Sequence, residues 1–184
     1  MKTYAIISDI HGNSLALEAV LADIKSRDIE TIINLGDHFF GALEPEIVSF
    51  ILRENEMLCI SGNTDREILE SIDAGFEKDG MDRVKADLSD QSISWLRKLP
   101  KTEVLDGLFF VCHGTPESDD EYLLEKVTEK GVFMLGDIYE NKLNNKDQAK
   151  IYYQKIITDY PGSLWINDAR KRFRILRGDK PDAS

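Results

Sequence analysis

Four short apolar runs divide the first 112 residues of the chain, and stretches with helical periodicity lie between them. Each run is rich in Ile, Val, Leu or Phe, as strands buried in a parallel sheet are. The runs are Tyr4–Ile7, Thr31–Leu35, Met57–Ile60 and Leu108–Cys112. Their alternation with helical segments predicts an α/β fold with a sheet and flanking helices.

Four helices are expected between and after these strands, each with its own start or stop signal. The start signals are Asn13 or Ser14, Pro45 and Ser89, and Gly131 is expected to end a fourth helix over Glu121–Lys130. The side chains expected to face the core from the first three helices are Leu17, Val20, Leu21 and Ile24, then Ile47, Phe50 and Ile51, and then Ile93, Leu96 and Leu99.

Polar residues and a neighbouring glycine follow every apolar run. The chemistry-bearing residues are Asp9 and His11, then Asp37, then Asn63, and then His113. Ligands of α/β sheets bind beyond the carboxyl ends of the strands, so these five residues are candidate metal ligands. Their mixed oxygen and nitrogen donors suit Mn, Fe, Zn or Ni. An Asp carboxylate can also bridge two cations, and a pair of cations is the usual arrangement for attack of water on phosphorus.

Each candidate residue also has a purely structural interpretation. Asp9 and Asp37 could form turns or cap helices, and His113 could be a hydrogen-bonded core histidine. The order of the four blocks favours ligation. His38 is interpreted as a pocket wall with a minor chance of acting as a ligand. Cys59 and Cys112 are interpreted as small core residues.

The blocks Asp9-x-His11, Gly36-Asp37, Gly62-Asn63 and His113-Gly114 resemble those of the calcineurin-like metallophosphoesterases. The resemblance covers about residues 1–130 and is greatest to the small bacterial and archaeal phosphodiesterases. It implies that Asp9 and His11 hold one metal and that Asp37 bridges. It also implies that Asn63 and His113 hold a second metal, with Asn63 touching the substrate phosphate.

Two departures from the family pattern bear on activity. Thr64 stands where many members have a histidine near the leaving group, which leaves Asp65 and Arg66 as candidates for orienting the loop and the phosphate. The family's late Gly-His-x-His block is absent, because the chain has three histidines and none follows His113. The resemblance therefore implies a phosphomonoester or phosphodiester hydrolase with two divalent ions, Mn above Fe, Zn or Ni, weakened by two missing ligands. The alternative is an inactive phosphoesterase-like scaffold.

Composition and charge narrow the class of protein further. With 42% hydrophobic and 31% charged residues, the chain is neither low-complexity nor a membrane bundle, and no apolar run is as long as a bilayer span. Residues 1–131 carry 13 bases and 27 acids, a net charge of -14, whereas residues 132–184 carry 10 and 7, a net charge of +3. The acidic part disfavours binding to nucleic acid. Two cysteines in apolar runs favour a reducing cytoplasm.

The sequence changes character after Gly131, and two domains are expected, over residues 1–131 and 132–184. The later segment resembles one tetratricopeptide repeat through Leu135-Gly136, Tyr139, Ala149, Tyr153 and Pro161. Helices are expected over Asp147–Thr158 and Ser163–Leu176, with Leu135, Tyr139, Tyr153 and Ile156 buried. Because one repeat cannot bury its own apolar face, this tail is expected to bind the α/β part, a second copy or another protein.

A rival interpretation of the same segment places a strand over residues 132–135. Asp137 and Tyr139 would then stand in for the two missing histidines of the phosphoesterase site. The helical interpretation is favoured because the repeat-like pattern continues beyond these residues.

Overall fold

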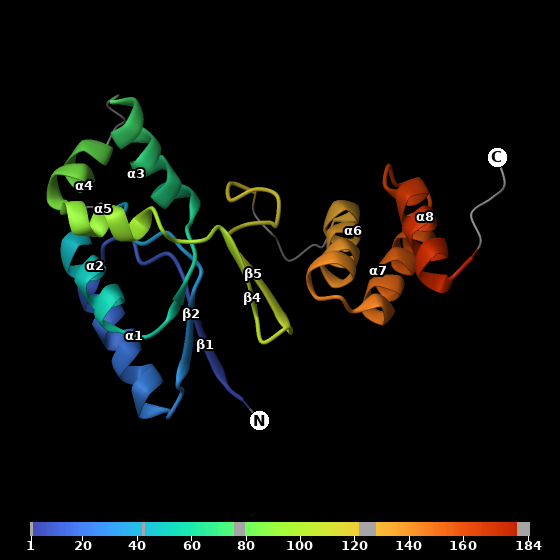
Figure 1. The fold of residues 1–184 in the computed structure, drawn as a ribbon, viewed down its shortest axis with the longest axis horizontal. Coiled ribbons are helices and arrows are strands. Elements are labelled where there is room, and N and C mark those ends of the chain that lie inside the picture. The colour runs from blue at the N-terminus through green and yellow to red at the C-terminus, as the bar shows by residue number, and fades with distance from the viewer. Residues whose placement is uncertain (1, 42, 76–79, 122–127, 180–184) are drawn as a thin grey trace. The chain divides into compact units, whose positions relative to one another are not determined.

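The computed structural model describes residues 2–41, 43–75, 80–121 and 128–179. The chain forms two compact units (Figure 1), one of Met1–Glu103 with Val111–Asp120 and one of Val104–Phe110 with Glu121–Ser184. Across the described residues, no helix combines the length and the apolar character that a membrane crossing requires.

A parallel three-stranded sheet forms the centre of the first unit. Its strands are β1 (Tyr4–Ile7), β2 (Thr31–Asn34) and β3 (Leu58–Cys59), in the order β1-β2-β3. Ile6 pairs with Ile33, and Ile33 pairs with Leu58. The first three apolar runs are therefore strands, as expected, although β3 is shorter than its run.

The fourth apolar run is a strand, β5 (Phe109–Cys112), but it pairs with β4 (Thr102–Leu105) in a separate two-stranded sheet. The expectation that this strand joins the parallel sheet is therefore wrong. Asp106 and Gly107 both have positive φ, 54° and 65°, which is the conformation of a tight hairpin turn. This turn joins β5 to its neighbour in sequence.

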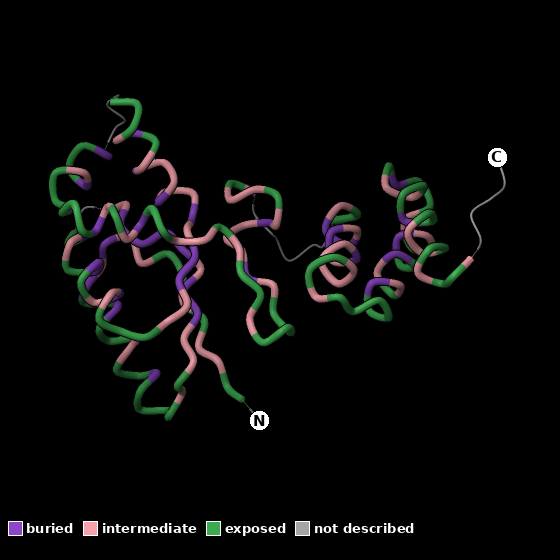
Figure 2. Tube along the Cα trace, in the orientation of Figure 1, coloured by how far each residue is buried: buried purple, intermediate pink, exposed green. Residues whose placement is uncertain are grey.

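Five helices accompany the parallel sheet: α1 (Ser14–Ser26), α2 (Pro45–Glu54), α3 (Asn63–Ala74), α4 (Met81–Asp87) and α5 (Asp90–Leu96). The expected caps are present. The Asn13 side chain accepts the Ala16 N–H and the Ser89 hydroxyl accepts the Ser92 N–H. Figure 2 shows how the buried residues gather on the inner sides of these helices. The core consists of Leu17, Phe39, Val48, Leu52, Ile68, Met81, Val84, Leu88 and Leu96.

The expected inner faces of α1 and α2 need correction. Val20 is 42% exposed, whereas Leu17 and Ile24 of the expected face of α1 are buried. On α2, Ile47 and Phe50 are exposed, whereas Val48 and Leu52 are buried. Polar contacts fix the rotation of α2, because Glu46 accepts the Ser89 N–H and the Ser49 hydroxyl donates to Ser92.

The second unit contains α6 (Glu129–Asp137), the π-helix η1 (Ile138–Lys142), α7 (Lys146–Asp159) and α8 (Ile166–Arg177). Its core is formed by Val132, Ala149, Tyr153, Ile156 and Ala169. The helical interpretation of the tail is confirmed, and the rival strand over residues 132–135 is wrong, because α6 covers those residues.

Two expectations for this unit are corrected, the helix stop at Gly131 and the full burial of Leu135 and Tyr139. Gly131 lies buried inside α6 and does not end a helix, because Thr128 caps α6 by accepting the Gly131 N–H. Leu135 and Tyr139 are only half-buried, whereas Tyr153 and Ile156 are fully buried. Most of the helix expected over Glu121–Lys130 lies outside the described residues.

Candidate metal centre

The loops that follow β1 and β2 continue the pairing of those strands. The Asp9 N–H donates to the Gly36 carbonyl at 3.0 Å, and the His11 N–H donates to the Asp37 carbonyl at 3.0 Å. Asp9, His11 and Asp37 have φ of 56°, 49° and 59°, a left-handed conformation that residues other than glycine rarely adopt. Such strain is typical of functional sites, because the surrounding structure must hold it.

The structure brings all five expected ligands together in the first unit. His11 Nε2 lies 3.7 Å from Asp9 Oδ1 and 3.8 Å from Asp37 Oδ2. His113 Nε2 lies 3.7 Å from Asp37 Oδ1 and 3.1 Å from Asn63 Oδ1. Ligand atoms of Asp9, Asp37 and His113 all lie within 4.8 Å of one another. The two oxygens of Asp37 thus face different histidines.

The hydrogen bonds of the two histidines fix which nitrogen carries the proton. Nδ1 of His11 lies 2.7 Å from the Phe40 carbonyl, and Nδ1 of His113 lies 2.7 Å from the Leu35 carbonyl. A carbonyl oxygen can only accept, so Nδ1 carries the hydrogen in both rings. In the neutral ring, Nε2 keeps a lone pair that faces carboxylate or amide oxygens. Lone pairs that converge from carboxylate, amide and imidazole groups suit a cation, so these residues fit a divalent metal.

Asp37 is the most enclosed of the five residues, at 4% exposure. Burial raises the pKa of its carboxyl group, and the hydrogen bond that Oδ1 accepts from the Thr64 N–H at 3.0 Å opposes that rise. A bound divalent cation stabilises the ionised form of a carboxylate. A cation bound to Asp37 would therefore offset the free-energy cost of burying its ionised carboxylate.

Two glycines let the loops after β2 and β3 approach each other. A Cβ on Gly62 would lie 2.1 Å from Asp37 Oδ1, and a Cβ on Gly36 would lie 2.4 Å from the Gly62 nitrogen. Gly36 also has a φ of 104°, which favours glycine. The glycines beside the expected ligands are thus needed for the close packing of this site.

Asp65 is enclosed beneath the loops of the site and is not exposed to a substrate, as a residue that orients a phosphate would have to be. Its carboxylate is fully buried and accepts the backbone N–H groups of Gly62 at 2.9 Å, Asp37 at 2.9 Å and His38 at 3.0 Å. Burial raises the pKa of Asp65, but the charge and hydrogen bonds of His38 and these N–H groups outweigh it, and the pKa lies below its usual value. Asp65 therefore orients the loops and cannot touch a phosphate.

The interpretation of His38 as a pocket wall is wrong, because its side chain is fully buried. Its Nδ1 lies 2.7 Å from Asp65 Oδ2, and its ring packs edge-on against Trp95.

Of the expected pair of core cysteines, Cys59 is buried and Cys112 is half-buried. Burial raises the pKa of the Cys59 thiol to about 12, which keeps it protonated.

Arg66 is held by three carboxylates. Its guanidinium donates to both oxygens of Asp119 at 2.8 and 3.0 Å, to Asp120 at 2.9 Å and to Glu70 at 3.2 Å. These hydrogen bonds, chiefly the one to Asp119, raise the pKa of Arg66. Arg66 thus ties the loop after His113 to α3, and its donors are already occupied by carboxylates.

Sequence reasoning missed several contributors to this site. The Phe40 and Leu35 carbonyls orient the two histidines, and a backbone group leaves no signal in the sequence. The contact between His38 and Asp65 was missed because each residue was interpreted separately. The Asp119-Asp120 pair, which follows His113 closely, was a visible signal for a partner of Arg66.

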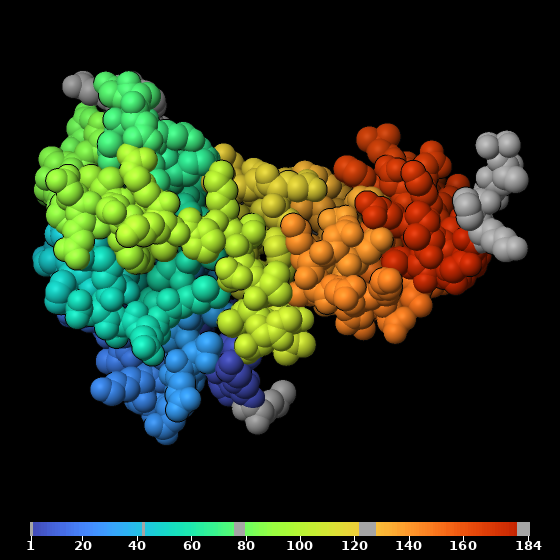
Figure 3. Space-filling view, in the orientation of Figure 1, coloured from blue at the N-terminus to red at the C-terminus, as the bar shows by residue number. Residues whose placement is uncertain are grey.

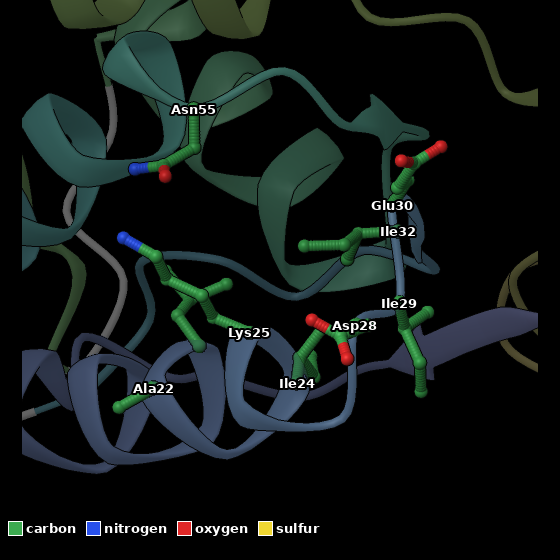
Figure 4. Close-up of a pocket in the computed structure, with 9 residues that line it drawn as sticks. Ala22, Ile24, Lys25, Asp28, Ile29, Glu30, Ile32 and Asn55 are labelled. Atoms are coloured by element: carbon green, nitrogen blue, oxygen red, sulfur yellow. The ribbon is translucent and has the colours of Figure 1, made fainter.

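Two cavities of about 420 Å³ each open in the first unit. One is surrounded by side chains of α1, β2 and the loop between them (Figure 4). It includes Glu30, directly before β2, so it lies at the amino end of that strand, away from the candidate ligands. Ser61 and Arg66 line the other cavity, which therefore adjoins the loop that carries Asn63.

Comparisons with known proteins identify the family to which the chain belongs. A sequence model described as the calcineurin-like phosphoesterase superfamily domain matches residues 1–179. An uncharacterised protein of Methanocaldococcus jannaschii is 35% identical over an alignment of 145 residues, and the match covers 73% of this chain and 58% of that protein. The crystal structure of a metallophosphoesterase from Sphaerobacter thermophilus superposes with a TM-score of 0.54 and 27% identity, covering 65% of this chain and 50% of that one.

The chain thus spans between half and three fifths of the length of these two relatives. The match to the family model runs through the helices α6, α7 and α8, across residues expected to resemble a tetratricopeptide repeat. The repeat assignment gains no support from these comparisons.

Proposed function

Since the chain belongs to the calcineurin-like phosphoesterase superfamily, we propose that it hydrolyses phosphate esters with two divalent cations held by Asp9, His11, Asp37, Asn63 and His113. Members of this family are generally metal-dependent phosphoesterases. One observation carries the proposal. In both His11 and His113, Nδ1 is hydrogen-bonded to a backbone carbonyl and Nε2 faces Asp37. That is the tautomer a metal-binding histidine needs.

The chain's own residues divide into two half-sites around Asp37. His11 Nε2 lies beside Asp37 Oδ2 and Asp9 Oδ1, whereas His113 Nε2 lies beside Asp37 Oδ1 and Asn63 Oδ1. Asp37 is therefore proposed as the ligand that both cations share. Asn63, at the first residue of α3, is proposed to contact the substrate phosphate as well. The bound cations supply Lewis-acid activation of a water near neutral pH.

The donor set supports a choice of metal and substrate. Carboxylate, amide and imidazole donors favour Mn, with Fe, Zn or Ni as alternatives. We propose a phosphomonoester or phosphodiester substrate, and the cavity lined by Ser61 and Arg66 offers room for its organic group. With no histidine after His113, each cation has one imidazole fewer than in the family pattern, so we expect weaker metal binding and slower hydrolysis.

The test is hydrolysis of bis(4-nitrophenyl) phosphate and 4-nitrophenyl phosphate by the full chain in Mn²⁺ titrations. We expect release of 4-nitrophenol that saturates with Mn²⁺ and stops with a chelator. Equal rates with a chelator present would refute a metal-dependent reaction. Mn²⁺ binding without hydrolysis of either ester would favour the alternative, an inactive phosphoesterase-like scaffold.

Three further proposals are not tested by these hydrolysis experiments. A domain boundary at residue 131, a protein partner or second copy bound through residues 132–184, and a cytoplasmic location stay predictions from the sequence. Size-exclusion chromatography with light scattering on the full chain tests the second of these.

A further inference from the structure

His38 is an imidazole placed where the surroundings are apolar. It is fully buried, and its ring centroid lies 5.4 Å from that of Trp95 and 5.7 Å from that of Phe39. A buried polar ring is costly unless it makes a hydrogen bond. Within the described residues, Nε2 has no partner, so the side chain has one polar contact, from Nδ1 to Asp65 Oδ2 at 2.7 Å.

The Asp65 carboxylate joins the two loops that carry Asp37 and Asn63. Besides His38 Nδ1, it accepts the N–H groups of Asp37 and His38 from the loop after β2 and the N–H group of Gly62 from the loop after β3. A carboxylate that accepts several backbone N–H groups is held in its ionised form. Nδ1 of His38 therefore donates, and the bond is charge-assisted.

We propose that His38 is a positioning residue for the candidate metal centre. Its Nδ1–H holds the Asp65 carboxylate in place, and Asp65 in turn holds the backbone of Asp37 in its left-handed conformation. The part of this proposal that concerns metal affinity rests on the proposed function. The part that concerns the loops depends only on the contacts of His38, Asp65 and Asp37.

Three substitutions separate positioning from simple core packing. His38→Asn keeps an N–H donor near the place of Nδ1, whereas His38→Leu fills the core without a donor. Phe39→Leu is the matched control, because Phe39 is as fully buried as His38, packs beside its ring and touches Asp65 through none of the described hydrogen bonds. Thermal unfolding of each variant measures the packing cost separately.

Isothermal titration with Mn²⁺ is the first measurement. Removing a partner that orients a ligand typically weakens metal binding about 10–100-fold, so we expect His38→Leu to lose about tenfold in affinity. His38→Asn and Phe39→Leu should stay within about twofold of the parent. Equal affinities for parent and His38→Leu, or equal losses in His38→Leu and Phe39→Leu, would overturn the proposal.

Amide hydrogen exchange in the metal-free protein is the second measurement and does not depend on the proposed function. If His38 holds Asp65, the amides of Asp37 and Gly62 should exchange about tenfold faster in His38→Leu than in Phe39→Leu, because local opening becomes easier. Unchanged exchange at both amides would overturn the proposal. A parent that binds no Mn²⁺ would refute the metal centre, and the exchange rates would still decide the role of His38.

Discussion

The carboxyl ends of β1–β3 and the helices α6–α8 are stabilised by different kinds of contact. At the strand ends, polar side chains are held by backbone groups, and three non-glycine residues have left-handed φ. In the helical unit, aromatic rings pack together: Phe133 stacks on Trp165 at 4.9 Å, and Tyr139 stacks on Tyr152 at 5.3 Å. Figure 3 shows, in orange to red, the surface that α6–α8 present on one face.

Each region also contains an enclosed carboxylate, and the partners of the two differ. Asp65 accepts backbone N–H groups and a histidine, which fixes loops in strained conformations. Glu140 accepts the Tyr153 hydroxyl at 2.8 Å and the Arg172 guanidinium at 3.3 Å, which joins helices through their side chains. Backbone contacts hold the loops of the candidate site in left-handed conformations, whereas side-chain packing joins the helices of the second unit, although Asn144 there also has a positive φ.

The largest effect should come from Asp37→Ala. Because both half-sites face Asp37, we expect Mn²⁺-dependent hydrolysis to fall by at least about 10³-fold, about 4 kcal/mol of barrier. Steady-state kinetics at saturating Mn²⁺ measure this loss. Asp23→Ala removes an exposed carboxylate of α1 and should leave the rate unchanged. A hydrolysis rate within tenfold of the parent would exclude Asp37 as the shared ligand.

Tyr153→Ala should have the largest effect in the helical unit. Tyr153 is fully buried, so its removal should cost about 3–4 kcal/mol of unfolding free energy, measured by urea denaturation with circular dichroism. Tyr153→Phe removes only the hydroxyl bond to Glu140 and should cost about 1 kcal/mol. Mn²⁺ affinity should not change, because the candidate ligands lie in the other unit. A cost below about 1 kcal/mol for Tyr153→Ala would contradict a core role.

Gly62→Ala tests the close approach of the two loops. The added Cβ would lie 2.1 Å from Asp37 Oδ1, and overpacking of this kind costs about 1–3 kcal/mol. We expect Mn²⁺ affinity, measured by calorimetry, to fall about tenfold. The control is Gly162→Ala, where a Cβ would meet nothing within 4 Å. Unchanged affinity in Gly62→Ala would show that the site tolerates a wider loop separation.

The smallest effect is expected from Arg172→Gln. Its side chain is 40% exposed, so solvent screens its ion pair with Glu140, and the loss should stay below about 1 kcal/mol. Urea denaturation of Arg172→Gln and Tyr153→Phe compares the unfolding free energies lost when each partner of Glu140 is removed. A loss for Arg172→Gln larger than that for Tyr153→Phe would mean that the ion pair, and not the buried hydroxyl, fixes Glu140.

Local patterns were sufficient for much of this protein. The apolar runs predicted the strands β1 to β3, and Asn13, Pro45 and Ser89 marked the starts of three helices, because these signals act within one turn or strand. Asp9, His11, Asp37 and Asn63 could be named because residues that follow parallel strands meet at one edge of a sheet. His113 was named on the same premise, although its strand β5 belongs to the separate two-stranded sheet. No structure was needed for that inference.

Only the tertiary structure decided how those residues are held. The inner face of α2 depends on hydrogen bonds to α5, a segment about 40 residues away. Helical periodicity alone placed Ile51 on that face correctly but Ile47 and Phe50 wrongly. The tautomers of His11 and His113 depend on carbonyl groups, which every residue possesses and no sequence pattern distinguishes. The pairing of His38 with Asp65 arises because two loops 27 residues apart close on each other, and such long-range contacts exist only once the chain has folded.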